Sequence, residues 1–150
     1  MENRYYGKYR AIVVNTSDPE QRGRIRVKCP KVLGDYISAW CEPCIPFAYE
    51  AGGDFHIPKV NDFVWVEFEN GEPDKPIWVG SLWTIGNAPL GANYDVQTRV
   101  IEFNGGRITM TAQGITIQIG SSTISMTSAG VINITGSSSV NVNGGTINLN

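Results

Sequence analysis

The stretch GITIQIGSSTISMTSAGVINITG, residues 114–136, decides the fold of the C-terminal part of this chain. It contains no charged residue, and the last charge in the whole sequence is that of Arg107. Within the stretch, aliphatic side chains alternate with Thr, Gln, Ser and Asn. Period-two alternation of this kind predicts short β-strands, each with one apolar and one polar face.

The same alternation extends from residue 108 to residue 150. Turn-forming clusters such as GSS, SAG, GSSS and NGG separate the strands, and the block repeats about every eight residues. We expect the apolar faces to consist of the alternating aliphatic residues, which are Ile108, Met110, Ile115, Ile117, Ile119, Ile124, Met126, Ile132, Ile134, Val140, Val142, Ile147 and Leu149.

The length of the repeat favours an assembly of three chains. One coil of a single-chain solenoid needs about 20 residues or more, whereas three chains that each supply one eight-residue side provide about 24. The pattern therefore predicts an intertwined trimeric β-helix or β-prism, with strands paired between chains and the aliphatic side chains on the trimer axis. Two alternatives stay open, namely a disordered Ser/Gly linker and a hairpin meander formed by one chain.

Composition limits the other classes of protein. The formal net charge of −2 gives no electrostatic reason to expect binding to nucleic acid or to an anionic membrane. The sequence has no run of 18 apolar residues, and its polar beginning, MENRYYGKYR, lacks the apolar core of a signal peptide. We therefore expect synthesis in the host cytoplasm. Three cysteines, an odd number, do not suggest a disulfide framework.

The front half predicts a small all-β domain. Strands are expected at residues 8–15, 23–29, 38–44, 63–69 and 75–83, separated by turn signals and with no helix among them. Five short strands over about 80 residues are typical of a small closed barrel. The expected core consists of Ile12, Val14, Ile25, Val27, Val64, Val66, Ile77 and Val79.

Two segments carry a resemblance to a known family. In VNTSDPEQRGRIRVKCP, residues 14–30, an Asp-Pro is followed by Gly-Arg and a strand that ends in Pro30. In AGGDFHIPKVNDFVWVEFENGEPDKPIWVG, residues 51–80, a Gly-rich loop and Pro58 precede two strands joined by an Asn-Gly turn. This pattern resembles the OB-fold domain of contractile-tail central spikes, which include phage baseplate spikes and the valine-glycine repeat protein of type VI secretion. One departure is Asn61, where the family usually has Gly.

The resemblance implies a domain order and a set of partners. We expect a five-stranded OB-fold barrel at residues 1–83, a linker at 84–98 and a trimeric β-helix shaft at 99–150. The chain would be a structural spike in a phage tail baseplate or an equivalent contractile injection particle, in contact with tail hub and tube proteins and, transiently, with the host envelope. A PAAR-like protein would cover the tip, whose exposed face is expected at Ile147, Asn148, Leu149 and Asn150.

Catalytic and metal-binding interpretations are weaker. No carboxylate pair looks set in a cleft, and the linker leaves no room for the lysozyme domain of some relatives, so we expect neither enzymatic activity nor a cofactor. Weak metal-ligand candidates are Cys29, Cys41, Cys44 and His56. Arg24, Arg26 and Lys28 alternate along one strand, which keeps a second hypothesis open: an OB-fold module that binds nucleic acid or saccharide, carried on a trimeric stalk.

Overall fold

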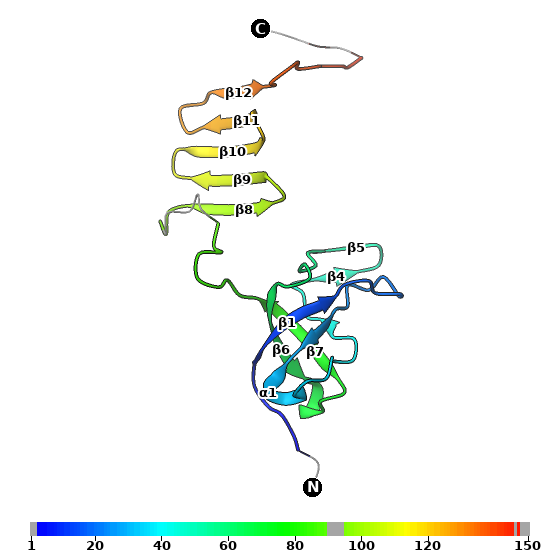
Figure 1. Ribbon diagram of the computed structural model, residues 1–150. Helices are drawn as coiled ribbons and strands as arrows, with labels where there is room; N and C mark the ends of the chain where they lie inside the picture. Colours follow the sequence, from blue (N-terminus) through cyan, green and yellow to red (C-terminus); the bar gives the residue numbers. More distant parts are fainter. Residues whose placement is uncertain (1–2, 90–94, 146, 148–150) are drawn as a thin grey trace. The chain divides into compact units, whose positions relative to one another are not determined.

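The computed structural model describes residues 3–89, 95–145 and 147. The chain divides into two compact units, Met1–Gly86 and Asn87–Asn150, and each is described by itself (Figure 1). Residues 90–94 of the predicted linker lie outside the described residues. The boundaries expected at residues 83/84 and 98/99 stay predictions.

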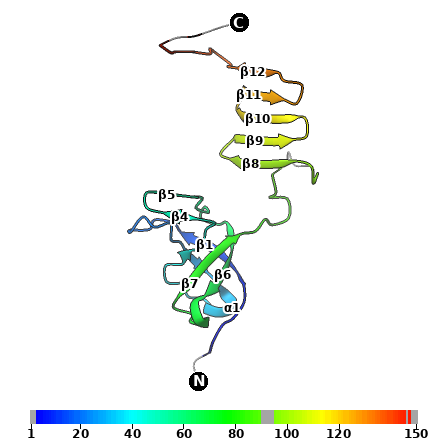
Figure 2. The same cartoon turned by 180° about the vertical axis from the view of Figure 1, so that it is seen from behind.

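The first unit is a five-stranded curled sheet of the OB type (Figure 2). Its strands are β1 (Tyr9–Asn15), β2 (Arg26–Lys28), β3 (Glu42–Pro43), β6 (Phe63–Phe68) and β7 (Pro76–Ser81), in the order β2-β1-β6-β7-β3. Strands β3 and β7 pair in parallel, and the other neighbours are antiparallel. Two isolated bridges, Ile25 to Cys41 and Lys28 to Ile37, join the two ends of the sheet and curl it round one core.

Shorter elements fill the connections of this unit. They are α1 (Pro30–Leu33), the hairpin of β4 (Ala48–Tyr49) and β5 (Gly52–Gly53), and a 3-10 turn at Glu69–Gly71. The expectation of no helix was wrong at α1, where Pro30 occupies the first turn and Gly34, with φ 57°, ends the helix. At Asn61 the backbone has φ 75°, a conformation that Asn tolerates better than most residues, so Asn can stand where the family that the sequence resembles usually has Gly.

The core prediction is confirmed on two strands and wrong on two. Ile25, Val27, Val64 and Val66 are all 0% exposed. In β1, however, Ala11 and Val13 are buried while Ile12 and Val14 are half-buried.

In β7 the inward residues are likewise Pro76 and Trp78, and Ile77 and Val79 are half-buried. Both strands carry apolar residues on successive positions, so alternation alone could not select the buried face. The Trp78 indole also donates a hydrogen bond to the carbonyl oxygen of Gly23 at 3.2 Å, which holds that ring inside.

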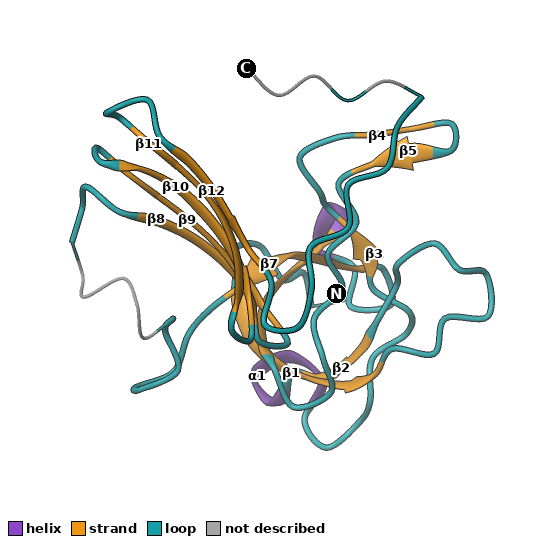
Figure 3. Cartoon of the chain, turned by 90° about the horizontal axis from the view of Figure 1, so that it is seen from above, coloured by secondary structure: helices purple, strands orange, loops and turns teal. Residues whose placement is uncertain are grey.

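The second unit is an antiparallel meander. Its strands are β8 (Arg99–Phe103), β9 (Gly106–Thr111), β10 (Gly114–Ile119), β11 (Ser122–Thr127) and β12 (Ile132–Thr135), and each pairs with the next (Figure 3). A two-residue turn with positive φ at both positions, 49° at Asn104 and 80° at Gly105, joins β8 to β9. Such a turn matches the right-handed twist of the flanking strands and closes a tight hairpin.

This pairing corrects one part of the sequence-based prediction. The ladders of β8–β12 are made within one chain, whereas we expected strands paired between chains. Turns of a few residues keep successive strands adjacent, so each finds its hydrogen-bond partner next to it in the sequence. Val140 and Val142, expected to continue the strands, lie outside any strand in the described part of the tail.

Within the described residues, no helix combines the length and the hydropathy needed to cross a membrane.

Candidate assembly surfaces

The β8–β12 sheet has one face made of large apolar side chains. Residues directly opposite each other in an antiparallel ladder share a face, so the pairing registers define its columns. The central column consists of isoleucine at every strand: Ile101, Ile108, Ile117, Ile124 and Ile134. One flanking column is Arg99, Met110, Ile115, Met126 and Ile132, and the other contains Phe103, Gly106, Ile119 and Ser122. We call these three columns together the apolar face.

Within the second unit, the described residues leave most of the apolar face exposed. Ile108, Gly106 and Ser122 are half-buried, and the exposed aliphatic side chains of the face range from 36% exposure at Ile115 to 67% at Ile119 and Ile132. Monomeric soluble proteins rarely expose contiguous apolar patches of this kind, and such patches mark sites of association. The apolar face is therefore a candidate surface for association with another protein chain.

The opposite face of the same sheet is polar. Its central column is Val100, Thr109, Thr116, Ser125 and Asn133. Asn133 donates a side-chain hydrogen bond to the Ser125 hydroxyl at 3.4 Å, and Arg107 forms an ion pair with Glu102 at 2.6 Å on the neighbouring column. The sheet thus presents small polar groups to water on one side only.

The predicted axis residues from 108 to 134 all lie on the apolar face. Sequence reasoning missed Ile101 and Phe103, which extend that face by one strand. The signal was available, because the alternation of the tail continues backward through the Asn104–Gly105 turn. Ile147 is 49% exposed, whereas Asn148, Leu149 and Asn150 of the expected tip face lie outside the described residues.

The cysteine and histidine candidates do not come together as a ligand set. No group of three or more His, Cys, Asp or Glu that could hold a metal ion occurs among the described residues. Cys29 and Cys41 belong to the barrel core, and burial raises the pKa of both thiols, that of Cys41 to about 11. Cys44 is exposed, and the His56 ring contacts Asp54 at 2.8 Å.

Two of the three basic residues of strand β2 and its approach make contacts within the barrel domain. Arg24 is 8% exposed and donates two hydrogen bonds, at 2.7 and 3.0 Å, to one oxygen of Asp18. Arg26 donates to the Ser38 carbonyl oxygen at 2.9 Å, and both guanidinium groups lie over the Trp40 ring. Only Lys28 of this series is exposed. Arg24 and Arg26 are thus engaged in contacts within the chain.

Asp18 organises the loop that precedes β2. Its carboxylate accepts hydrogen bonds from the backbone N–H groups of Glu20, Arg22 and Arg24, at 2.8–3.2 Å. The Arg24 side chain, followed by these N–H groups, holds the pKa of Asp18 well below its usual range. The Asp-Pro…Gly-Arg pattern is therefore a structural clamp for the loop.

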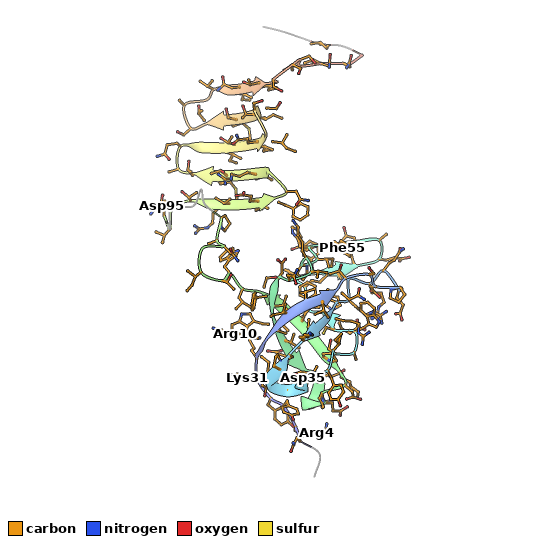
Figure 4. The ribbon with its side chains drawn as sticks, in the orientation of Figure 1. Arg4, Arg10, Lys31, Asp35, Phe55 and Asp95 are labelled. Atoms are coloured by element: carbon orange, nitrogen blue, oxygen red, sulfur yellow. The ribbon has the colours of Figure 1, made fainter. Side chains whose placement is uncertain are left out.

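The barrel also carries an exposed aromatic patch around the β4–β5 hairpin. The Phe47 and Tyr49 rings are stacked, with centroids 6.3 Å apart and planes 7° apart, and the two residues are 57% and 70% exposed. Phe55, labelled in Figure 4, follows the same hairpin and is also 70% exposed. Aromatic side chains of this kind are enriched at protein–protein interfaces.

Comparison with known proteins identifies the family. The model of the Type VI secretion system/phage-baseplate injector OB domain matches residues 9–83, half of the chain. The chain belongs to this family. No curated protein matches it. The match spans the strands of the OB-type sheet and both segments on which the resemblance rested.

Membership of the injector family shows the class of protein and the kind of particle to which it belongs. This is a structural, non-enzymatic family, and the injector OB domain is a component of a phage baseplate or a type VI secretion particle. Such a component has other tail proteins as partners. The β8–β12 sheet lies beyond the matched residues, so its role follows from its own geometry.

Proposed function

We propose that this chain is the central spike of a contractile injection particle and that it works as a homotrimer. The observation that carries the proposal is the apolar face of β8–β12, which the described residues of its own unit leave largely exposed. A spike of this kind would sit under the tail tube through its barrel and pierce the host envelope when the sheath contracts. Family membership supports the baseplate location, and the physics of the apolar face supports the trimer.

Three copies of the sheet can cover one another's apolar faces. If each sheet forms one side of a triangular prism, every layer brings three side chains of the central isoleucine column round the axis. Fully burying a large aliphatic side chain is worth about 1.5–3 kcal/mol, and this face exposes such side chains at every strand. Trimerisation thus removes the surface that would otherwise promote uncontrolled aggregation.

The outer face suits a rod that slides through an envelope. Its side chains from β9 to β12 are uncharged after Arg107, and apart from Arg107 and Gln118 they are small. Backbone ladders run across each sheet, and apolar packing would join the three sheets along the axis. Such a rod transmits axial force mechanically, with no chemical step.

The contacts at the two ends of the spike belong to the same proposal. The exposed aromatic patch of Phe47, Tyr49 and Phe55 is suited to contact with a tail hub or tube protein, because aromatic side chains provide large contact areas. At the C-terminal end, a PAAR-like tip protein would cover residues 147–150. Ile147, 49% exposed, is the described residue of that end face.

The competing hypothesis of a nucleic-acid or saccharide module is weakened by the barrel itself. Arg24 and Arg26, two of the three residues that suggested it, are held by Asp18, Ser38 and Trp40. A positively charged groove needs such groups free to meet a phosphate backbone.

The decisive experiment measures mass. Light scattering on the full chain at micromolar concentration is expected to give three times the chain mass of 16.4 kDa. A monomer would overturn the proposal, and a dimer would replace the prism by two sheets packed face to face. Particles assembled with the wild-type chain should release potassium from target cells on contraction, and particles whose spike cannot trimerise should not.

A further inference from the structure

The strands of the apolar face differ in the size of their two end residues. In β9 the inward residues are Gly106 at one end and Met110 at the other, and in β11 they are Ser122 and Met126. The strand between them, β10, has an isoleucine at both ends. The longest side chains of the two flanking strands therefore stand at one margin of the sheet, and their smallest residues at the other.

The glycine at position 106 is only partly required by its own chain, because a Cβ there would make a tight contact that a shift of a few tenths of an ångström would relieve. Its φ lies outside the left-handed region, and an added Cβ would lie 3.3 Å from the Phe103 carbonyl oxygen and 3.9 Å from Ile119 Cδ1. Gly114 is different, because its φ is 152° and a Cβ there would lie 2.0 Å from the Met126 carbonyl oxygen. The absence of a side chain at Gly106 thus leaves a recess on the apolar face that the backbone of this position requires much less strictly than that of Gly114.

Threefold symmetry determines which margins meet. A rotation carries each sheet onto the next without inverting it, so the methionine margin of one subunit must face the Gly106–Ser122 margin of its neighbour. Strands with the same number lie at the same mean height. The end residues of a given strand therefore meet the opposite end of the same strand in the adjacent subunit.

We propose that each corner of the prism is a head-to-tail joint in which Met110 and Met126 fill the recesses beside Gly106 and Ser122 of the neighbouring subunit. The inference rests on the trimer proposed above. Within each of these layers the pairing sets the longest side chain against the smallest, which keeps the corner at the packing density of a protein interior. Methionine suits the position because its flexible thioether fills irregular gaps.

The β8 layer has a matching pair. Arg99 occupies the methionine margin, where its guanidinium group donates hydrogen bonds to the carbonyl oxygens of Val96 and Thr98, and Phe103 occupies the opposite margin. The same joint brings this guanidinium group beside an aromatic ring rather than beside two other guanidinium groups. A cation over an aromatic face is attractive, whereas like charges at one corner repel. The charge pattern of β8 therefore agrees with the size pattern of β9 and β11.

A disulfide test separates this joint from other arrangements. In the full chain with Cys44→Ser, the pair Gly106→Cys and Met110→Cys cannot form a bridge within one chain. Four residues along a strand span about 13 Å, and a disulfide needs Cα atoms within about 7 Å. Mild oxidation, followed by non-reducing denaturing electrophoresis, is expected to convert most of the protein to a covalent trimer.

Matched controls define the result. Each single-cysteine variant, and the pair Gly106→Cys with Ile132→Cys three strands away, should remain at the monomer band. Two further double variants pair Gly106→Cys with either Arg99→Cys or Ile115→Cys, on the adjacent strands. A crosslink in one of these instead would show that the joint is shifted by one strand and would overturn the proposal. The pair Ser122→Cys with Met126→Cys tests the same joint in β11 with a nearly isosteric change at Ser122, should the first pair fail to fold.

Light scattering on the same samples distinguishes failure of the joint from failure of the trimer. A trimeric mass without a crosslink in either pair would refute the head-to-tail joint and leave the trimer intact. A covalent dimer, or a monomeric mass, would refute the trimer itself.

Discussion

Replacing Ile117 by aspartate tests the apolar face most directly. Ile117 lies on the middle strand, β10, between Ile108 and Ile124 in the central column, and is 45% exposed in the single chain. Fully burying such a side chain contributes about 1.5–3 kcal/mol, so covering the part that is still exposed contributes the corresponding fraction, about 0.7–1.4 kcal/mol per chain. The lost burial alone therefore costs a trimer about 2–4 kcal/mol.

The three carboxyl groups destabilise the trimer further, and by more than the lost burial. Near the axis they cannot all ionise, so each must bind a proton, and a pKa raised by about 3 units corresponds to about 4 kcal/mol per chain at neutral pH. The trimer as a whole is destabilised by about 15 kcal/mol, or roughly eleven powers of ten in its association constant. We expect Ile117→Asp to be monomeric at pH 7, as measured by light scattering at a typical working concentration of about 10 µM.

Thr116→Asp is the matched control. Thr116 is the preceding residue on the same strand, but it lies on the polar face between Thr109 and Ser125. Its carboxylate would stay in water, so the stability of the trimer should change by no more than about 0.5 kcal/mol. All four tryptophans precede residue 87, so their fluorescence reports whether the barrel of each variant is intact.

The pH dependence gives a second readout. A carboxyl whose pKa is raised in the trimer weakens assembly above the ordinary pKa of about 3.9 and ceases to do so below it. Acidification should therefore restore part of the Ile117→Asp trimer. A variant that stays trimeric at pH 7, or a Thr116→Asp change that disrupts assembly equally, would refute the assignment of the two faces.

Three further outcomes are expected. Val13→Ala should lower the free energy of unfolding of the barrel by about 2 kcal/mol and Val14→Ala by less than about 1 kcal/mol, measured in urea, because only Val13 is fully buried; equal losses would contradict the observed register of β1. Because the pKa of Asp18 is lower in the folded state than in the unfolded state, its contribution to the free energy of unfolding is fully present above about pH 4 and declines on further acidification. Asp18→Asn should therefore flatten that part of the stability–pH curve. An unchanged curve would contradict the stabilising role of Asp18 in the loop. Cys44 should react with a thiol reagent in the native protein while the two buried thiols react only after unfolding, and rapid native labelling of all three would contradict the described core.

The sequence predicted much of the barrel because its turn chemistry is local. The Gly-Arg and Asn-Gly motifs bound strands at nearly the observed residues, and isoleucine or valine at alternate positions of β2 and β6 identified their buried faces. The prediction of the buried face was wrong on β1 and β7, where apolar residues lie on both faces of the strand. The choice there depends on which side chains meet across the curled sheet, such as Trp78 against Gly23.

In the tail the sequence by itself determined which residues share a face. Alternation has a period of two in any β-strand, so the assignment holds whichever strands pair. Only the tertiary structure decided that the strands pair within one chain, because a hydrogen-bonded ladder of uniform Ser, Thr and Ile looks the same in sequence whether its neighbour is the next strand or another chain. The tertiary structure also decided that Arg24 pairs with Asp18 and is not free to contact a ligand. These two residues are six positions apart, so their ion pair forms only when the loop between them folds back on itself. The period-two alternation of side chains follows from the local backbone geometry of a strand, so the sequence shows it directly. Strand pairing and burial depend instead on which distant groups the fold brings into contact.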